Sequence, residues 1–271
     1  MSDDIILDIQ NVTKEFPGVT ALNDVSIQIK RGEIHGLCGE NGAGKSTLMK
    51  ILSGVYPYGT YDGRVLFNGN ELKLEHSSIR QATDLGIAIV HQELTLVPSM
   101  TVGENVYLGK EPTERGAINW NKVYADTREI LQRYKLNVSA RAVVQELGVG
   151  KMQMVEIAKA LSENAQVLIL DEPTSALTEA EIDKLMEILG ILKAHGVTCI
   201  YITHKLKEFF RITDNVTVLR DGEKVITLPT SELTEERLVN YMVGRQMKER
   251  FPKGNRQPGE ILFEVKDLHA L

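Results

Sequence analysis

The sequence predicts an α/β protein in which helices cover a largely parallel β-sheet. Two observations predict this class. Short apolar runs of β type alternate with helical patterns through most of the 271 residues, as they do where helices connect parallel strands. In addition, one apolar run leads through a glycine-rich segment directly into a helical pattern. The four strands expected in the core are Ile34–Cys38, Ile87–Val90, Val167–Leu170 and Val197–Thr203.

Two further regions flank this predicted core. Near the N-terminus, Ile6–Val12 and Val25–Ile29 alternate apolar and polar residues, which predicts an antiparallel β subdomain with one exposed face. Between Thr101 and Leu161 helical patterns dominate and predict a helical subdomain. Thr101 and Glu104 have the spacing of a capping box, although Glu104 also fits a contact with a partner.

The charge and composition of the chain argue against some classes of function. The 31 basic and 37 acidic residues give a net charge of −6, which removes the usual electrostatic reason to expect nucleic-acid binding. No segment approaches the ~20 apolar residues that span a bilayer, and the acidic N-terminus lacks the features of a signal peptide. Cys38 and Cys199 lie in apolar runs and are expected to be buried, reduced cysteines of a cytosolic protein. A membrane role would therefore act through a partner.

The C-terminal region predicts a domain boundary. Residues 246–259 contain prolines and glycines among charged residues and are expected to form a linker. The following ILFEVKDL resembles IILDIQNV near the N-terminus, with Glu264 standing 264 − 8 = 256 residues after Asp8. We therefore expect residues 1–245 to form one domain and residues 260–271 to be the first strand of a truncated second copy.

A phosphate-binding loop is the clearest motif. The segment reads Gly39, Glu40, Asn41, Gly42, Ala43, Gly44, Lys45, Ser46 and Thr47, and it follows the strand that ends at Cys38. It matches the pattern G-x-x-x-x-G-K-[ST], in which backbone N–H groups and a helix N-terminus hold phosphates. Lys45 is expected to reach the β- and γ-phosphates of ATP, and the Ser46 hydroxyl is expected to bind Mg²⁺.

Two later strands end in residues suited to hydrolysis. One apolar run ends at Asp171 and Glu172, where Asp171 can hold Mg²⁺ through water and Glu172 can take the proton of the attacking water. The next strand ends at His204, which lies 204 − 171 = 33 residues beyond Asp171. Because the two strands belong to the same predicted sheet, His204 is expected to contact the γ-phosphate.

Together these motifs resemble the ABC ATPase family of P-loop proteins over residues 4–245. The shared order is the phosphate loop, a glutamine after a strand at Gln92, a glycine-bearing turn at Leu147, the acidic pair and then His204. The resemblance implies a RecA-like parallel core with antiparallel and helical subdomains, and it implies ATP and Mg²⁺ as cofactors. It also implies a head-to-tail dimer in which the phosphate loop of one half and the glycine-bearing turn of the other hold each ATP.

The resemblance assigns roles to further residues. Phe16 would stack on adenine, Gln92 would touch Mg²⁺ and report the nucleotide state to membrane subunits, and Ser175–Leu177 would cross the dimer interface. The glycine-bearing turn, here called the signature turn, would contact the ATP of the partner half. It consists of Leu147, Gly148, Val149, Gly150 and Lys151.

This chain departs from the family pattern at the signature turn and after the interface loop. The usual signature is leucine, serine, glycine, glycine, glutamine, so a serine hydroxyl that would bond phosphate is missing. Lys151 fits either a solvated surface lysine or a contact with the triphosphate or ribose of the other half's ATP. Thr178 replaces a common aspartate, and with Glu181 it has the spacing of a capping box.

Within the family, the signature turn and the helix after it are similar to the ATPases of bacterial monosaccharide importers. The long turn within Met49–Gly69 is most similar to those of xylose importers. The implied partners are membrane permease subunits, a second ATPase half and, indirectly, a sugar-binding protein outside the cytoplasm. The implied location is peripheral, on the cytoplasmic face of the membrane. Two alternatives fit the same motifs, namely a soluble tandem ABC protein acting on ribosomes and the ATPase of an exporter.

Overall fold

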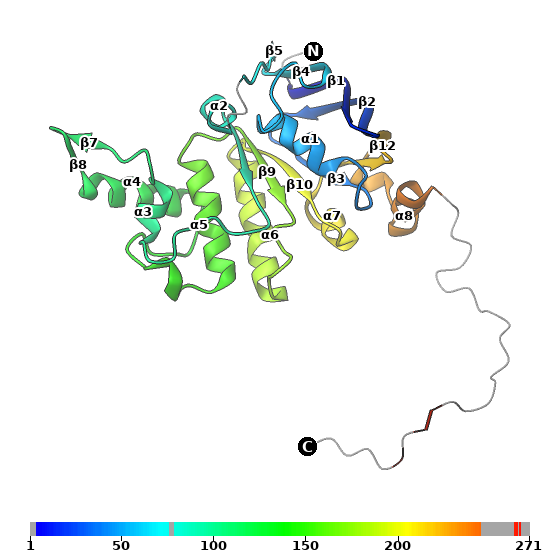
Figure 1. The fold of residues 1–271 in the computed structure, drawn as a ribbon. Helices are drawn as coiled ribbons and strands as arrows, with labels where there is room; N and C mark the ends of the chain where they lie inside the picture. Colours follow the sequence, from blue (N-terminus) through cyan, green and yellow to red (C-terminus); the bar gives the residue numbers. More distant parts are fainter. Residues whose placement is uncertain (1–3, 76–78, 245–262, 265, 267–271) are drawn as a thin grey trace.

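The computed structural model describes residues 4–75, 79–244, 263, 264 and 266. The predicted linker at 246–259 lies outside these residues, as does nearly all of the predicted strand at 260–271, so both assignments stay predictions. The described chain forms a lobe that contains two sheets and a helical lobe beside it (Figure 1). No helix in this described part is long and apolar enough to cross a membrane.

The larger sheet forms the predicted core. Its strands lie in the order β12 (Glu223–Pro229), β11 (Asn215–Arg220), β3 (Ile34–Cys38), β10 (Thr198–Ile202), β9 (Val167–Asp171) and β6 (Ile87–Val90). β12 pairs antiparallel with β11, and every other neighbouring pair is parallel. The four predicted core strands are confirmed as β3, β6, β9 and β10, with ends that differ by at most one residue. As predicted, Cys38 and Cys199 are buried in this sheet as free thiols.

A four-stranded antiparallel sheet confirms the predicted β subdomain. Its strands lie in the order β2 (Val19–Lys30), β1 (Ile5–Phe16), β4 (Asp62–Phe67) and β5 (Asn70–Glu71). One apolar core joins this sheet, helix α1 (Lys45–Leu52) and one face of the larger sheet, and it includes Ile27, Leu48 and Ile169. The phosphate loop therefore leads into a helix that packs between two sheets.

A second apolar core lies on the other face of the larger sheet and extends into the helical lobe. The helices of this lobe are α3 (Val102–Val106), α4 (Trp120–Arg133) and α5 (Val149–Leu161), with the 3₁₀ turn η1 (Val144–Glu146) before α5. The sequence predicted only helices here, but β7 (Thr113–Glu114) and β8 (Ala117–Ile118) form a short hairpin. Its two turn residues, Arg115 and Gly116, have φ angles of 51° and 83°. Positive φ at both central residues is the geometry of a tight two-residue hairpin. An arginine is unusual at the first of these positions, so the sequence does not indicate the hairpin.

The remaining helical elements surround the larger sheet. They are α2 (Ile79–Leu85), α6 (Glu179–Ala194), α7 (Leu206–Ile212), η2 (Thr230–Glu232) and α8 (Glu235–Val243). Both predicted capping boxes are confirmed, by Thr101 with Glu104 on α3 and by Thr178 with Glu181 on α6. Glu104 Oε2 accepts hydrogen bonds from the N–H and the hydroxyl of Thr101, each at 2.6 Å, so the helix cap accounts for this carboxylate.

Candidate nucleotide-binding site

The phosphate loop joins β3 to α1 through tightly packed glycines. A Cβ atom at Gly39 would lie 2.4 Å from the carbonyl oxygen of Leu219, so only glycine fits there. Gly44 has a φ of 102°, in the left-handed region, and is the N-cap of α1 without any side-chain cap bond. The first N–H groups of α1 therefore lack a capping side chain. A bound phosphate would supply the acceptor, because anions are stabilised at helix N-termini.

Lys45 begins α1 and turns its side chain back toward the loop. Its Nζ donates to the carbonyl oxygens of Gly39 at 2.7 Å and Glu40 at 3.0 Å. Burial lowers the pKa of Lys45, and the carboxylates of Glu172 and Asp171 oppose that shift. The ammonium group therefore lies within electrostatic range of both acids.

Asp171 and Glu172 stand at the carboxyl end of β9. Burial and the neighbouring Glu172 raise the pKa of Asp171, while His91 and Lys45 lower it. The backbone of Glu172 has a φ of 46°, a conformation that costs a non-glycine residue about 1–3 kcal/mol. The N–H of Glu172 donates to the carbonyl oxygen of Ile202 at 2.9 Å. This bond to the end of β10 helps to hold the strained backbone of Glu172.

His204 follows β10 and meets Glu172 across the sheet edge. Its Nδ1 lies 3.1 Å from Oε2 of Glu172. The His204 side chain is 65% exposed and that of Glu172 is 23% exposed, so both are open to solvent or ligand. They come together because Ile202 of β10 lies opposite Asp171 of β9 in the parallel ladder. This edge therefore offers one carboxylate and one imidazole to the same bound molecule.

Gln92 lies two residues after β6, at the same edge of the sheet, and its side chain is exposed. The segment that follows it is fixed to the helical lobe. The N–H and hydroxyl of Thr95 donate to Glu156 of α5 at 2.5 and 2.9 Å. Asn105 of α3 exchanges two hydrogen bonds with the backbone of Val97, at 2.7 and 3.1 Å. The segment that carries Gln92 is therefore joined directly to two helices of the other lobe.

Phe16, the predicted adenine contact, is the last residue of β1. Its ring packs edge-on against Tyr56, with centroids 5.5 Å apart. The ammonium of Lys14 lies 5.0 Å from the Phe16 centroid and 5.2 Å from the Tyr56 centroid. The sequence analysis did not single out Tyr56, because nothing in its local pattern indicates that it reaches the end of β1.

The signature turn lies on the helical lobe, and α5 stands apart from α1 in Figure 1. The structure therefore does not bring Leu147–Lys151 to the phosphate loop of the same chain. Gly148 is the N-cap of α5 and provides no side-chain cap bond. Val149 and Lys151 are exposed, whereas Gly150 is buried.

Glu181 supplies the cap that Gly148 lacks. Its Oε1 accepts the N–H of Gly150 at 3.2 Å, while its Oε2 accepts the N–H and hydroxyl of Thr178 at 3.0 and 2.8 Å. A Cβ atom at position 150 would lie 2.5 Å from Oε1, so a side chain there would displace the Glu181 carboxylate. One carboxylate thus caps both α5 and α6. The sequence analysis assigned Glu181 to α6 alone and missed its contact with the signature turn.

Mg²⁺ is compatible with the residues at this edge. Among the described residues, no group of three His, Cys, Asp or Glu side chains is placed to hold a metal. Nucleotide-bound Mg²⁺ does not require such a group, since it keeps several waters and uses one or two protein ligands together with phosphates. The raised pKa of Asp171 arises from burial and from repulsion by Glu172, which a nearby cation would relieve. The Ser46 hydroxyl, exposed on the first turn of α1, is a second suitable oxygen.

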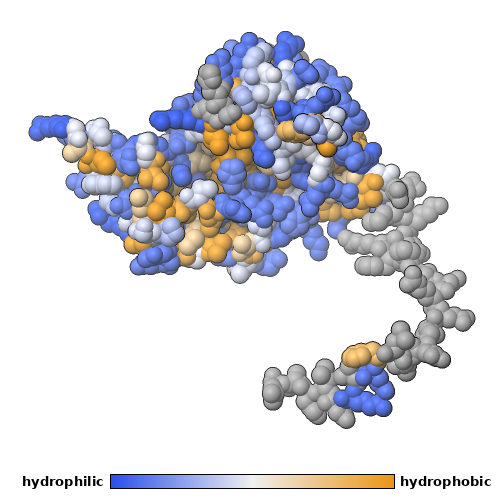
Figure 2. Space-filling model, viewed as in Figure 1, coloured by the Kyte–Doolittle hydropathy of each residue, from blue (hydrophilic) through white to orange (hydrophobic). Residues whose placement is uncertain are grey.

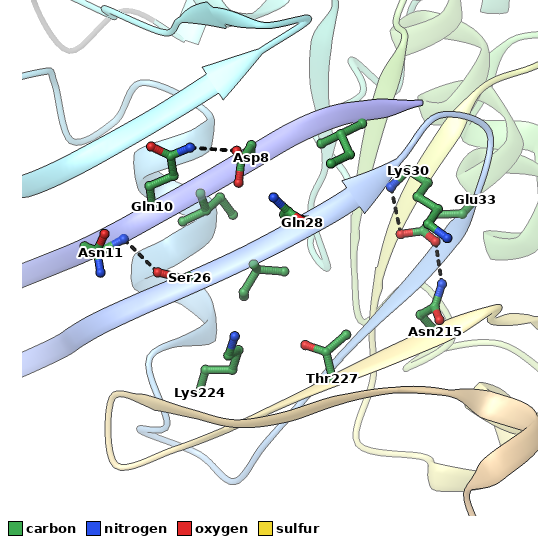
Figure 3. Close-up of a pocket in the computed structure, with 13 residues that line it drawn as sticks. Asp8, Gln10, Asn11, Ser26, Gln28, Lys30, Glu33, Asn215, Lys224 and Thr227 are labelled. Carbon is green, nitrogen blue, oxygen red and sulfur yellow. Dashed lines mark hydrogen bonds between the residues drawn. The ribbon is translucent and has the colours of Figure 1, made fainter. Parts of the chain in front are cut away.

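A separate hollow of about 500 Å³ is lined mostly by β1 and β2 and reaches β12 and the amino ends of β3 and β11 (Figure 3). Glu33, which precedes β3, accepts hydrogen bonds there from the N–H of Lys30 at 3.0 Å and from the side chain of Asn215 at 2.6 Å. Because Glu33 and Asn215 stand at the amino ends of β3 and β11, this hollow is remote from the phosphate loop. It is not part of the nucleotide site.

Known proteins resemble the chain over nearly all of its length. The family model for the ABC transporter matches residues 22–175. The xylose import ATP-binding protein XylG of Thermoanaerobacter pseudethanolicus is 56% identical over 262 residues, which are 97% of this chain and 52% of that protein. The L-arabinose transport ATP-binding protein AraG of Geobacillus stearothermophilus is 49% identical over 266 residues, with coverage of 97% and 52%. This chain thus spans about half the length of the curated relatives it matches.

A solved structure shows the same fold. The ADP conformation of MJ1267, an ATP-binding cassette of an ABC transporter, matches with a TM-score of 0.75 and 26% identity, covering 89% of this chain and 99% of that one. The predicted resemblance and fold are therefore confirmed. Since the family match runs from β2 through the phosphate loop to the segment after Glu172, more than half of the chain, this chain belongs to the ABC transporter family.

Proposed function

We propose that this chain is an ATP-binding and ATP-hydrolysing half of the ATPase of a monosaccharide importer. The observation that carries the proposal is the row of chemical groups along one sheet edge. The phosphate loop follows β3, His204 follows β10, Asp171 and Glu172 end β9, and Gln92 follows β6. These strands are neighbours in space although not in sequence. Ligands of open α/β sheets bind at the carboxyl ends of the strands, which is where this row lies.

In this proposal the phosphate loop holds the triphosphate of ATP. Backbone N–H groups of residues 39–47 and the N-terminus of α1 receive phosphate oxygens. Lys45 exchanges its bonds to the Gly39 and Glu40 carbonyls for the β- and γ-phosphates, and Phe16 stacks on adenine. Mg²⁺, held by Ser46 and Gln92 and through water by Asp171, would neutralise charge on the phosphates.

Glu172 and His204 then act on the γ-phosphate. Glu172 accepts a proton from a water molecule as the water oxygen bonds to the γ-phosphorus. The bond from phosphorus to the bridging oxygen breaks, and ADP leaves with its electron pair. His204, which lies 3.1 Å from Glu172, contacts the γ-phosphate and keeps the carboxylate oriented. The products are ADP and inorganic phosphate.

The signature turn serves an ATP bound to another half. It lies in the lobe away from its own phosphate loop (Figure 1), so the ATP that it contacts belongs to a second copy or to another half of a longer chain. Ser175–Leu177, just before the capped start of α6, crosses the interface between the halves. In the same proposal residues 246–259 link two halves, and residues 260–271 begin the second.

Replacing Lys151 by alanine is expected to weaken ATP-driven closure of the two halves. A lysine in the first turn of a helix is unfavourable by about 0.3–1 kcal/mol when exposed, and Lys151 is exposed at the start of α5. A phosphate or ribose of the opposing ATP would make the interaction of this lysine with its surroundings favourable. The loss should be greater at low salt than at high salt, since exposed charge contacts are screened.

The measurement is ATP affinity and turnover of the complete two-half protein, in complex with its membrane partner, at two salt concentrations. Lys184→Ala is the matched control, because Lys184 is an exposed lysine on α6 paired with Glu187. If the Lys151→Ala protein matches its parent at both salt concentrations, Lys151 is only a surface residue.

The membrane partner is proposed to bind a groove beside the segment that carries Gln92. The groove has a volume of about 730 Å³ and lies between α2, the end of β6 and α5. Ile79 and Leu108 on its rim are 47% and 41% exposed, and Figure 2 shows apolar surface beside α2. Thr95 and Glu156 line the same groove and join the Gln92 segment to α5. A partner seated here therefore touches the segment that would respond to nucleotide.

The remaining parts of the proposal concern cargo and location. Xylose is the proposed sugar, supported by the long turn within Met49–Gly69 and by the name of the relative that is 56% identical. A second relative is named for L-arabinose, so a neighbouring pentose is the competing cargo. The chain would lie on the cytoplasmic face of the membrane, bound to permease subunits, with a sugar-binding protein engaged only indirectly and no nucleic acid as ligand.

Co-purification tests the importer assignment. The complete tagged protein, extracted from membranes of its own organism, is expected to bring down a permease that mass spectrometry identifies. Leu108→Asp should lose the permease and keep ATP binding, because a charge on the groove rim opposes an apolar contact. Ile118→Asp, a matched control at a 40% exposed residue of β8, should keep both. Recovery of ribosomes, or of no membrane protein, would contradict the assignment.

A further inference from the structure

Glu208 is a buried carboxylate that joins two segments of the site. It lies in the first turn of α7 and is 4% exposed. Its Oε2 accepts hydrogen bonds from the Thr174 hydroxyl at 3.0 Å and from the Tyr201 phenol at 2.7 Å. Thr174 lies two residues after Glu172, and Tyr201 lies in β10, three residues before His204. A single carboxylate oxygen thus connects the segment of the proposed base to the strand that leads to the histidine.

Lys205 adds a third contact between these segments. Its Nζ donates to the carbonyl oxygen of Thr174 at 2.9 Å and lies 3.7 Å from Oε1 of Glu208. This Oε1 is buried without a hydrogen-bond partner among the described residues. Burying an incompletely bonded carboxylate is unfavourable, and an apolar residue of similar size would pack without that cost. Packing alone therefore does not account for an acid at this position.

We propose that Glu208 is a positioning residue that holds Glu172 in place beside His204, acting through Thr174 and Tyr201. This inference rests on the proposed function of Glu172 as the general base. The strained backbone of Glu172 is tied to β10 on one side by its own N–H bond to Ile202. Two residues later, the bond from Thr174 to Glu208 ties the same segment again. A backbone in an unfavourable conformation persists only where its surroundings fix it, and these two ties fix it from both sides.

Glu208→Met tests the proposal, because methionine is close to glutamate in length but has no oxygen that could accept from Thr174 or Tyr201. In single-turnover hydrolysis with protein in excess over ATP, we expect the rate to fall on the order of 10- to 100-fold, as a small misplacement of a reacting group costs. ATP affinity should not change, because the phosphate loop is untouched. Thr174→Val, which removes one of the two donors, should also slow hydrolysis. The double variant should be no slower than the Glu208→Met protein, since both changes break the bond between Thr174 and Glu208. Arg211→Gln is the control, because it breaks the exposed 2.7 Å bond from α7 to Asp183.

A Glu172→Gln background separates positioning from general damage. A residue that acts only through the base has nothing left to position there, so Glu208→Met should not slow the residual hydrolysis further. The proposal is wrong if Glu208→Met leaves the native rate unchanged, or if it slows the Glu172→Gln protein by the same factor as the native protein.

If Glu172→Gln does not change the rate of hydrolysis, the proposed function of Glu172 is wrong. Amide hydrogen exchange then tests separately whether Glu208 holds the backbone of residues 172–175. Faster exchange at Glu172 and Ser175 in the Glu208→Met protein, with unchanged exchange in residues 39–47, would support the tie. Unchanged exchange at both residues would overturn it.

Discussion

Replacing Glu172 by glutamine is expected to slow ATP hydrolysis by about 10²–10⁴-fold, the usual contribution of a general base, while ATP binding persists. A glutamine side chain has nearly the same shape but cannot take the proton of the attacking water. The backbone bond from residue 172 to Ile202 does not involve the side chain, so the strained turn should be kept. Lys45 and the phosphate loop are likewise unchanged, which is why affinity should survive.

The experiment compares equilibrium ATP binding with the rate of a single turnover. Glu179→Gln is the matched control, because Glu179 is an exposed acid on the first turn of α6 and the substitution removes the same charge. Native-like hydrolysis by the Glu172→Gln protein would exclude Glu172 as the base. A loss of both binding and hydrolysis would instead indicate damage to the nucleotide site.

The strands that carry the site could be predicted because they are buried on both faces. In β9, alternate residues face the two cores, with Val167 and Ile169 on one side and Leu168 and Leu170 on the other. Every position must then be apolar, and the run stands out in the sequence. For the same reason the first acids after it, at Asp171 and Glu172, are conspicuous. Both the strand and the residues at its carboxyl end can thus be predicted from the sequence.

Strand β11 could not be recognised in this way. The sequence NVTVLR alternates polar and apolar residues, which is typical of a strand with one exposed face, yet Val216–Leu219 are buried. Thr217 is tolerated inside because its hydroxyl bonds His35 and Thr227, each at 2.8 Å. The partners that make a buried polar residue acceptable come from other strands, so the sequence of β11 alone does not reveal its burial.

The contacts that Glu181 and Glu208 make with the candidate site could not be predicted from the sequence either. Glu181 and Glu208 both lie in the first turn of a helix, where the helix dipole favours acids in general, so neither residue stands out in the sequence. Their further partners, Gly150 and Thr174, are 31 and 34 positions away. Such contacts depend on how α5, α6 and α7 pack against the sheet. A residue pattern within one helix carries no information about them.

Replacing Lys45 by methionine is expected to weaken ATP binding on the order of 10- to 100-fold, which corresponds to the 1.5–3 kcal/mol of a hydrogen bond to a charged group. Methionine keeps much of the length of the side chain and removes its charge. The effect should be specific to phosphate, so affinity for adenosine should not change. Lys184→Met, which removes an exposed lysine from α6, is expected to bind ATP like the native chain.

The pH dependence of binding provides a second measurement on the same variant. Burial lowers the pKa of Lys45 from its ordinary value, and a bound phosphate pairs with the charged ammonium. The ATP affinity of the native chain should therefore fall as the pH rises toward that lowered pKa, because a larger fraction of Lys45 is then neutral. The Lys45→Met protein should lose this part of the pH dependence. Equal ATP affinity of the variant and the native chain across this pH range would mean that Lys45 does not bind the phosphates, and the assignment of the loop after β3 would fail with it.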